Sequence, residues 1–295
     1  MLSLCFRAAR ARYFTVSLLP VLLSATAVHR PWASGTWPAL FLVVLGAFLV
    51  HAGSNLWNDL ADELNGADRA NSAPSAFNGG SRVIQRGEAT CGSMRTAAVL
   101  CYAGAMLVAF LLKPRGGWGV PVLTLAGILL GICYSSRPTW FCAHGLGELV
   151  VAIAFGPLLA EGAYLALAGG LSWAVFLASL PLGLLVAAIL LVNSIPDIPP
   201  DAQVGKRTMA VRLGKSQAVM VYRAIIGAAF AALLAALATG AVPGRAALAL
   251  LTLPLAAWIS WRCGDPRQAF CIPVAVGTIL LHATLGASIV IGFLS

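Results

Sequence analysis

The chain has 295 residues, of which 60% are hydrophobic and only 10% are charged, and its mean hydropathy is +0.89. A soluble domain has about 25% charged residues, so this chain has too few polar side chains to cover the surface of a globule. The composition therefore excludes a soluble protein and indicates a polytopic membrane protein. In a membrane protein, the net charge of +9 indicates which side of the membrane holds the basic loops. We therefore expect no nucleic-acid partner.

Nine segments are apolar enough to form membrane helices, each of which needs about 20 mainly apolar residues. Apolar runs such as Val175–Val192 do not alternate polar and apolar residues as the strands of a transmembrane barrel do. The predicted fold is therefore an all-α bundle of about nine transmembrane helices. These helices are expected near 13–29, 38–57, 95–112, 118–135, 146–165, 172–194, 217–241, 245–261 and 270–294.

The basic residues divide unequally between the loops on the two sides of these helices. With the N-terminus placed in the cytoplasm, 15 Lys and Arg residues fall on the inner side and 4 on the outer side. Because cytoplasmic loops carry an excess of Lys and Arg, this distribution predicts that the N-terminus lies inside. The same assignment places nine of the ten acidic residues on the inner side, which the rule does not explain.

Two inner segments, 58–93 and 193–215, are the longest and most polar of the loops. Each opens with asparagine and clustered aspartate at the end of a predicted helix and then becomes basic. Their similarity predicts a single transmembrane domain over residues 1–295, built from two similar halves near 1–140 and 141–295.

The aspartates of these two segments have the spacing of a metal site. Asn55, Asp59 and Asp62 are spaced i, i+4, i+7, so they share one helical face if the second helix continues that far. Such oxygen ligands repel one another unless a cation joins them, and they suit Mg²⁺. Asp197 and Asp201 form a second pair, and two facing motifs are suited to hold a diphosphate through bridging metal ions. Helix capping and solvated loops are the alternative, but acids at the edge of an apolar bundle are costly and usually functional.

Four cations near these motifs are candidates for binding a diphosphate. Lys206 and Arg207 follow the second aspartate pair, Arg82 follows the first motif, and Arg137 lies in the third inner loop. Positive side chains in such places neutralise a diphosphate and stabilise it as a leaving group.

Two other residues near the motifs have simpler explanations. Membrane orientation accounts for Arg86 at least as well as a diphosphate does. His51 lies one turn before Asn55. A lone intramembrane histidine is more often a hydrogen-bonded packing group than a base, so His51 is not our first choice for a base.

The order of these residues resembles the UbiA superfamily of intramembrane prenyltransferases, and most of all its branch that prenylates 1,4-dihydroxy-2-naphthoate in menaquinone biosynthesis. The first motif of that branch, N-x-x-x-D-x-x-D-x-x-x-G-x-D, is matched by Asn55, Asp59, Asp62, Gly66 and Asp68. The second motif is N-x-x-x-D-x-x-x-D-x-x-x-G-K-R-T-x-A-V-x-L-G. It is matched by Asn193, Asp197, Asp201, Gly205, Lys206, Arg207, Thr208, Ala210, Val211, Leu213 and Gly214.

The resemblance implies a Mg²⁺-dependent enzyme of the bilayer that transfers a prenyl group from a polyprenyl diphosphate to an aromatic quinone precursor and releases diphosphate. It implies a bacterial inner membrane, with the active site facing the cytoplasm. Lys206, Arg207, Arg137 and Arg82 would bind the diphosphate, and Tyr134 would line the pocket of the allylic cation. Catalysis would depend on Tyr134 and on Asp59, Asp62, Asp197 and Asp201. The implied metal ligands are Asn55, Asp59, Asp62, Asp68, Asn193, Asp197 and Asp201.

One departure from the family pattern affects the second motif. The family usually has an arginine where this chain has Pro196, and Pro199 and Pro200 follow. Because proline cannot continue a helix interior, we expect Asp197 and Asp201 to lie on a broken segment.

This departure from the family pattern also leaves the identity of the acceptor substrate undetermined. One alternative is a UbiA-type terpene synthase, which uses no aromatic acceptor. Another is an ion-coupled transporter, although transporters bury charge near the bilayer midplane and these acids gather at one face.

Overall fold

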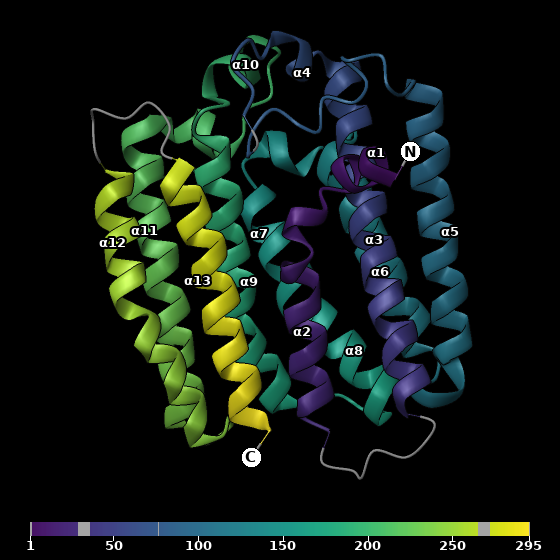
Figure 1. Ribbon diagram of the computed structural model, residues 1–295, viewed down its shortest axis with the longest axis vertical. Coiled ribbons are helices and arrows are strands. Elements are labelled where there is room, and N and C mark those ends of the chain that lie inside the picture. The colour runs from purple at the N-terminus through teal and green to yellow at the C-terminus, as the bar shows by residue number, and fades with distance from the viewer. Residues whose placement is uncertain (1, 29–35, 76, 265–271, 295) are drawn as a thin grey trace.

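Long apolar helices stand side by side in this protein, for which we describe a computed structural model (Figure 1). The structure describes residues 2–28, 36–75, 77–264 and 272–294, and these contain helices and connections but no strand. Arg30, Asp265 and Arg267, which enter the charge count, lie outside the described residues. The predicted all-α membrane bundle is confirmed.

Seven described helical segments are long and apolar enough to cross a membrane. They are α3 (Thr36–Asn65), α5 (Cys91–Gly116), the continuous run of α7 (Gly147–Ile153), η3 (Ala154–Leu158) and α8 (Leu159–Ala168), α9 (Trp173–Ser194), α11 (Met209–Ala238), the run of η4 (Gly244–Thr252) and α12 (Leu253–Cys263), and α13 (Ile272–Phe293).

Two shorter apolar helices accompany these seven: η1 (Ala11–Tyr13) with α2 (Thr15–Thr26), and α6 (Gly119–Ser135). Every predicted helix therefore has a helical counterpart among the described residues. How many of them cross a membrane, and whether the N-terminus lies inside, stay predictions. The division of the domain into two similar halves also stays a prediction.

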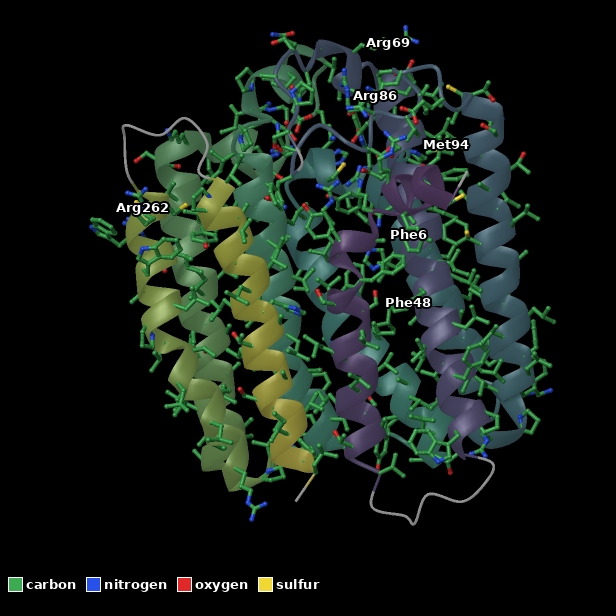
Figure 2. The ribbon with its side chains drawn as sticks, viewed as in Figure 1. Phe6, Phe48, Arg69, Arg86, Met94 and Arg262 are labelled. Atoms are coloured by element: carbon green, nitrogen blue, oxygen red, sulfur yellow. The ribbon has the colours of Figure 1, made fainter. Side chains whose placement is uncertain are left out.

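Besides the 3-10 helix η2 (Phe141–His144), three short α-helices remain, and these gather at one end of the bundle. Helices α1 (Leu2–Ala8), α4 (Ala67–Ala70) and α10 (Ile198–Gln203) lie at the end that carries the N-terminus, and the C-terminal helix ends at the opposite end (Figure 1). Helices α4 and α10 pack against each other. Arg69 and Arg86 lie at this same end (Figure 2). Both aspartate motifs therefore meet where the bundle is most polar.

The length of α3 explains why the first motif lies at the edge of the apolar bundle. Its 30 residues extend about 45 Å, which exceeds the hydrocarbon thickness of about 30 Å. The first turns of α3 are apolar, and its last turns carry Asp59 and Asp62. The helix can therefore cross a bilayer and still hold these acids beyond the hydrocarbon core.

Helix α9 is the most enclosed of the long helices and carries the second motif at its end. In its most apolar window, 72% of the residues are buried, compared with 50% or less in each of the other spanning candidates. Leu182, Leu185 and Leu191 have no exposed surface, because α2, α7, α11 and α13 pack around them. The position of Ser194, where α9 ends, is therefore well determined by packing.

A helical irregularity lies against α9. Residues Ala154–Leu158 form a π-turn with non-helical torsions at Gly156, directly before Pro157. Just before the π-turn, the backbone of α7 contacts the backbone of α9: a Cβ added at Gly183 in α9 would lie 2.2 Å from the carbonyl oxygen of Ala152 in α7. Only glycine permits this approach.

We predict that Gly183→Ala lowers the free energy of unfolding by about 1–3 kcal/mol, because the added methyl group must displace the backbone of Ala152. Thermal unfolding in detergent measures this change. The matched control is Gly227→Ala on α11, where a Cβ meets no atom within 4 Å. Equal stability of the two variants would contradict the proposed contact.

Candidate active site

A polar cavity of about 200 Å³ lies at the end of the bundle where α4 and α10 pack together. The first motif contributes Asn55, Asp62 and Asp68 to its wall, and the second contributes Asn193, Asp197, Asp201 and Lys206. The cavity is closed further by the segment before α2 and by the loop around Gly79. The two motifs, which lie more than 120 residues apart in sequence, therefore meet in one cavity.

The first motif lies on one continuous helix, as its spacing predicts. Helix α3 continues to Asn65, so Asn55, Asp59 and Asp62 share a face. Asp59 is 2% exposed, and its Oδ1 accepts a hydrogen bond from Arg10. The side-chain amide of Asn55 donates to the carbonyl oxygen of Ala9, at 3.0 Å. The N-terminal segment thus holds two residues of the first motif.

The second motif lies on a broken segment, as its prolines predict. Helix α9 ends at Ser194, Asp197 is the residue before α10, and Pro199 and Pro200 lie in the first turn of α10. Proline is tolerated there because the first backbone N–H groups of a helix have no partner within it. The N–H of Asp201 donates to the carbonyl oxygen of Asp197, at 2.9 Å, so the two aspartates stay one turn apart.

Lys206 joins the two motifs. Its Nζ donates to Oδ1 of Asp62 at 2.8 Å and lies 3.5 Å from Oδ1 of Asp201. The residue is only 8% exposed. Burial alone would lower the pKa of this ammonium group, but the two carboxylates raise it above its ordinary value. Lys206 is therefore a buried cation between the two acidic motifs, and it holds their segments together.

Asp197 is held by the loop that follows the first motif. The side-chain amides of Asn71 and Asn78 both donate to its Oδ1 at 2.8 Å, and the N–H of Gly79 lies 3.3 Å from its Oδ2. Neither asparagine was predicted as a site residue. Asn78 directly precedes the Gly79-Gly80 pair, but Asn71 lies eight residues before Gly79, and an asparagine is common in any loop.

The glycine pair in this loop has a structural requirement. Gly79 and Gly80 both have positive φ angles, which glycine adopts at little cost. A Cβ at Gly80 would lie 2.8 Å from Oδ2 of Asp68 and 3.2 Å from Oδ1 of Asp59. Gly80 therefore lets the backbone pass between two buried carboxylates.

The oxygen donors in and beside this cavity fit a Mg²⁺ ion: Asn193 lines the cavity wall, whereas Asp59 is not part of that wall. Oδ2 of Asp59 and Oδ1 of Asn193 are buried without a hydrogen-bond partner, although buried oxygens are nearly always paired. Carboxylate and amide oxygens are the ligands that Mg²⁺ prefers. Among the described residues, no three His, Cys, Asp or Glu side chains converge as a ready metal cluster. Arg10 and Lys206 instead neutralise the acids in this structure.

Burial changes the acidity of the remaining carboxyl groups. It raises the pKa of Asp68 to about 7, with a further contribution from the nearby charges of Asp62 and Asp59. Burial also raises the pKa of Asp201 to about 7 against the opposing effect of Lys206, and it raises the pKa of Asp197. The cavity wall thus carries four carboxyl groups, of Asp62, Asp68, Asp197 and Asp201, and four cations, of Arg7, Arg10, Arg12 and Lys206.

Three of the four predicted diphosphate-binding cations lie away from the cavity wall. Arg207 is exposed, and the exposed Arg137 guanidinium lies 4.7 Å from the ring centroid of Trp140. Arg82 donates to the carbonyl oxygen of Asp68. The predicted roles of these three residues stay predictions. Arg10 lines the cavity and was not predicted as a site residue, because nothing in the sequence relates it to Asp59.

A second, apolar cavity of about 250 Å³ continues from the polar one. Its wall comes mainly from α3, α5, α6 and α8. Tyr134, His51 and Phe155 line both cavities and so form part of their junction. Along α6 the apolar cavity extends from Tyr134 to Val120, which is 14 residues or about 21 Å of helix. The molecule therefore places a charged chamber at one end of a long apolar one.

Residues 17–271 match the UbiA prenyltransferase family. The chain belongs to this family. The resemblance found in the motifs is confirmed, and the protein is a membrane-embedded prenyltransferase.

Curated relatives share much of the chain. It is 31% identical over 224 residues to 1,4-dihydroxy-2-naphthoate octaprenyltransferase of Mycobacterium tuberculosis, covering 75% of this chain and 73% of that protein. It is 32% identical over 212 residues to the Escherichia coli protein of the same name, covering 68% and 67%.

Solved structures of UbiA homologues share the fold. One from Aeropyrum pernix has a TM-score of 0.73 at 18% identity, covering 95% of this chain and 98% of that one. Another, from Archaeoglobus fulgidus and bound to DMAPP and Mg²⁺, has a TM-score of 0.71 at 17% identity, covering 97% and 98%.

We predict that Lys206→Met lowers the free energy of unfolding by about 3 kcal/mol, because it leaves Asp62 and Asp201 buried without their cation. Unfolding in detergent measures the change, and Arg207→Met is the matched exposed control. In the double variant with Asp62→Asn, part of the loss should be recovered. Strict additivity of the two substitutions would contradict the pairing.

Proposed function

We propose that the protein transfers a polyprenyl group from its diphosphate to a 1,4-dihydroxy-2-naphthoate acceptor, with Mg²⁺ and with release of diphosphate, at the cytoplasmic face of a bacterial inner membrane. The observation that carries this proposal is the direct continuation of the charged cavity into the apolar one. A prenyl diphosphate has the same division between a charged head and an apolar tail. The names of the Mycobacterium tuberculosis and Escherichia coli relatives support the acceptor.

In the proposed reaction, the C1–O bond of the donor breaks and its electron pair leaves with the diphosphate. A ring carbon of the acceptor forms the new bond to C1, and the substituent that it carried, a proton or the carboxylate group as CO₂, departs. The residues that would hold Mg²⁺ are Asn55, Asp59, Asp62, Asp68, Asn193, Asp197 and Asp201. Bound Mg²⁺ would stabilise the negative charge that develops on the leaving diphosphate.

The protein's own side chains would control the fate of the allylic cation. Lys206 and Arg10 lie at the carboxylates, within reach of a diphosphate that enters the polar cavity. Tyr134 lies at the junction, where its ring face can stabilise a cation. The mainly apolar wall beyond it would keep water from C1, because it offers water few hydrogen-bonding partners.

The length of the apolar cavity bears on the donor. An extended five-carbon unit, with four chain bonds, spans about 5 Å, so about 21 Å of cavity holds about four units. A longer polyprenyl tail must therefore continue beyond the described cavity, and the bilayer is the apolar medium beside it.

We predict that Asp59→Asn and Asp197→Asn each abolish turnover while the protein stays folded, and that EDTA does so reversibly. Purified protein is incubated with farnesyl, geranylgeranyl or longer diphosphates, with and without 1,4-dihydroxy-2-naphthoate, and products are identified by mass. Glu161→Gln is the matched control. This acid lies in α8 and accepts the N–H of Ser172 at 3.0 Å, a bond that glutamine can keep.

Full activity of either aspartate variant would refute the metal-bridged mechanism. A hydrocarbon product with diphosphate release and no acceptor adduct would instead indicate a terpene synthase.

We predict that Gly127→Leu selects against long donors. Gly127 lines the apolar cavity seven residues from Tyr134, or about 10 Å along α6, and a Cβ there has its nearest neighbours at 3.8 and 3.9 Å. A leucine would fill the cavity beyond the second five-carbon unit. The ratio of kcat/KM for geranylgeranyl over dimethylallyl diphosphate should fall about 10-fold or more, which corresponds to the cost of overpacking.

The control for this prediction is Gly227→Leu on the exposed side of α11, which should leave the ratio unchanged. An unchanged ratio in Gly127→Leu would show that the tail does not occupy this cavity.

A further inference from the structure

An imidazole lies at the junction of the two cavities. His51 is 5% exposed and lines both the charged and the apolar chamber. Its Nδ1 is 2.6 Å from the hydroxyl oxygen of Ser17, which is also buried. Since Ser17 occupies Nδ1, Nε2 is the other hydrogen-bonding atom of the ring.

Aromatic rings surround this imidazole. The rings of Phe14 and Phe155 meet the His51 ring edge to face, with centroids at 5.0 and 5.2 Å. Phe48, one turn before His51 on α3, stacks on Phe14 at 4.6 Å. Phe48 lies at mid-height of the bundle, between the ribbons of α2 and α3 (Figure 2). Phe14 and Phe48 line neither cavity and therefore support the imidazole from within the protein, whereas Phe155 lies beside it in the wall of both cavities.

Phe155 occupies its place because the helix is irregular there. It lies in the π-turn Ala154–Leu158, which the close approach of Gly156 to Gly183 holds against α9. Such π-turns are frequent at functional sites, since they redirect a side chain without ending the helix. The wall of the junction is thus built by packing that reaches across the bundle.

Packing accounts for only one of the two ring nitrogens. Ser17 pairs with Nδ1, and because His51 lines both cavities, a molecule bound in them can pair with Nε2. The prenyl tail carries no hydrogen-bonding atom, and the diphosphate has Lys206 and Arg10 near it. The remaining reactant is the acceptor, a flat aromatic ring with hydroxyl groups, which must reach C1 of the donor at this junction.

We propose that His51 binds the aromatic acceptor: Nε2 makes a hydrogen bond with a ring hydroxyl group, and Phe155, which lines both cavities, lies beside the ring. This assignment rests on the proposed function, because it uses the donor position given there. It makes His51 and Phe155 determinants of acceptor specificity, and it makes Ser17 a positioning residue that fixes the imidazole.

The test replaces His51 by phenylalanine, which keeps the aromatic area and removes the hydrogen bond. Transfer by wild type and His51→Phe is compared for 1,4-dihydroxy-2-naphthoate and its dimethoxy analogue, after thermal unfolding has shown that the variant is folded. We expect the KM for the acceptor to rise about 10-fold, as for the loss of one buried hydrogen bond, with the KM for the donor unchanged. We also expect the preference for hydroxyl over methoxy to disappear.

His282→Phe is the matched control, because His282 is fully buried in α13 and lines neither cavity. If His51→Phe does not fold, His51→Met replaces it, since methionine has no strong hydrogen-bonding atom. An unchanged KM for the acceptor and an unchanged preference for hydroxyl would overturn the proposal.

Calorimetric titration of the naphthoate into each protein separates this inference from the proposed function. If the wild type transfers no prenyl group, the proposed function fails. The dissociation constant of the naphthoate for His51→Phe, divided by that for the wild type, then tests the role of His51. A ratio of about 10 supports this role. A ratio of one, or no binding to the wild type, refutes it.

Discussion

The burial of carboxylates at the end of an apolar bundle is the constraint on which the rest of the site depends. Each buried acid needs a cation or hydrogen-bond donors, and these come from distant parts of the chain. Lys206 forms ion pairs with Asp62 and Asp201, and Arg10 forms one with Asp59. Asn71 and Asn78 donate hydrogen bonds to Asp197. The N-terminal segment, the loop after α3 and the segment after α9 are thereby held over one cavity.

Two backbone irregularities position residues of this site. The prolines after Ser194 end α9 and start α10, so Asp197 and Asp201 turn toward the first motif instead of continuing along a spanning helix. The π-turn at Ala154–Leu158 sets Phe155 at the junction of the cavities. The π-turn packs against α9, and α10, which follows the proline break, packs against α4 and α11.

In the proposed reaction, the two cavities divide the chemistry of a prenyl diphosphate between two environments. The charged chamber would stabilise the departing diphosphate through fixed cations, which need little reorganisation to do so. The apolar chamber would keep water from the carbon that becomes electron-deficient. Tyr134, His51 and Phe155 line both cavities, so they would lie near the reacting atoms.

The sequence by itself determined the helices and the acidic motifs, because apolar length and i, i+4, i+7 spacing are local properties of the chain. It also placed the break at Pro196–Pro200, since proline acts on its own backbone. Only the tertiary structure decided which partners the acids have: it brought Arg10, Asn71 and Asn78 to them and left Arg137 and Arg207 exposed. A charge pair joins residues that are distant in sequence, and its energy depends on burial and distance, which exist only once the helices have packed.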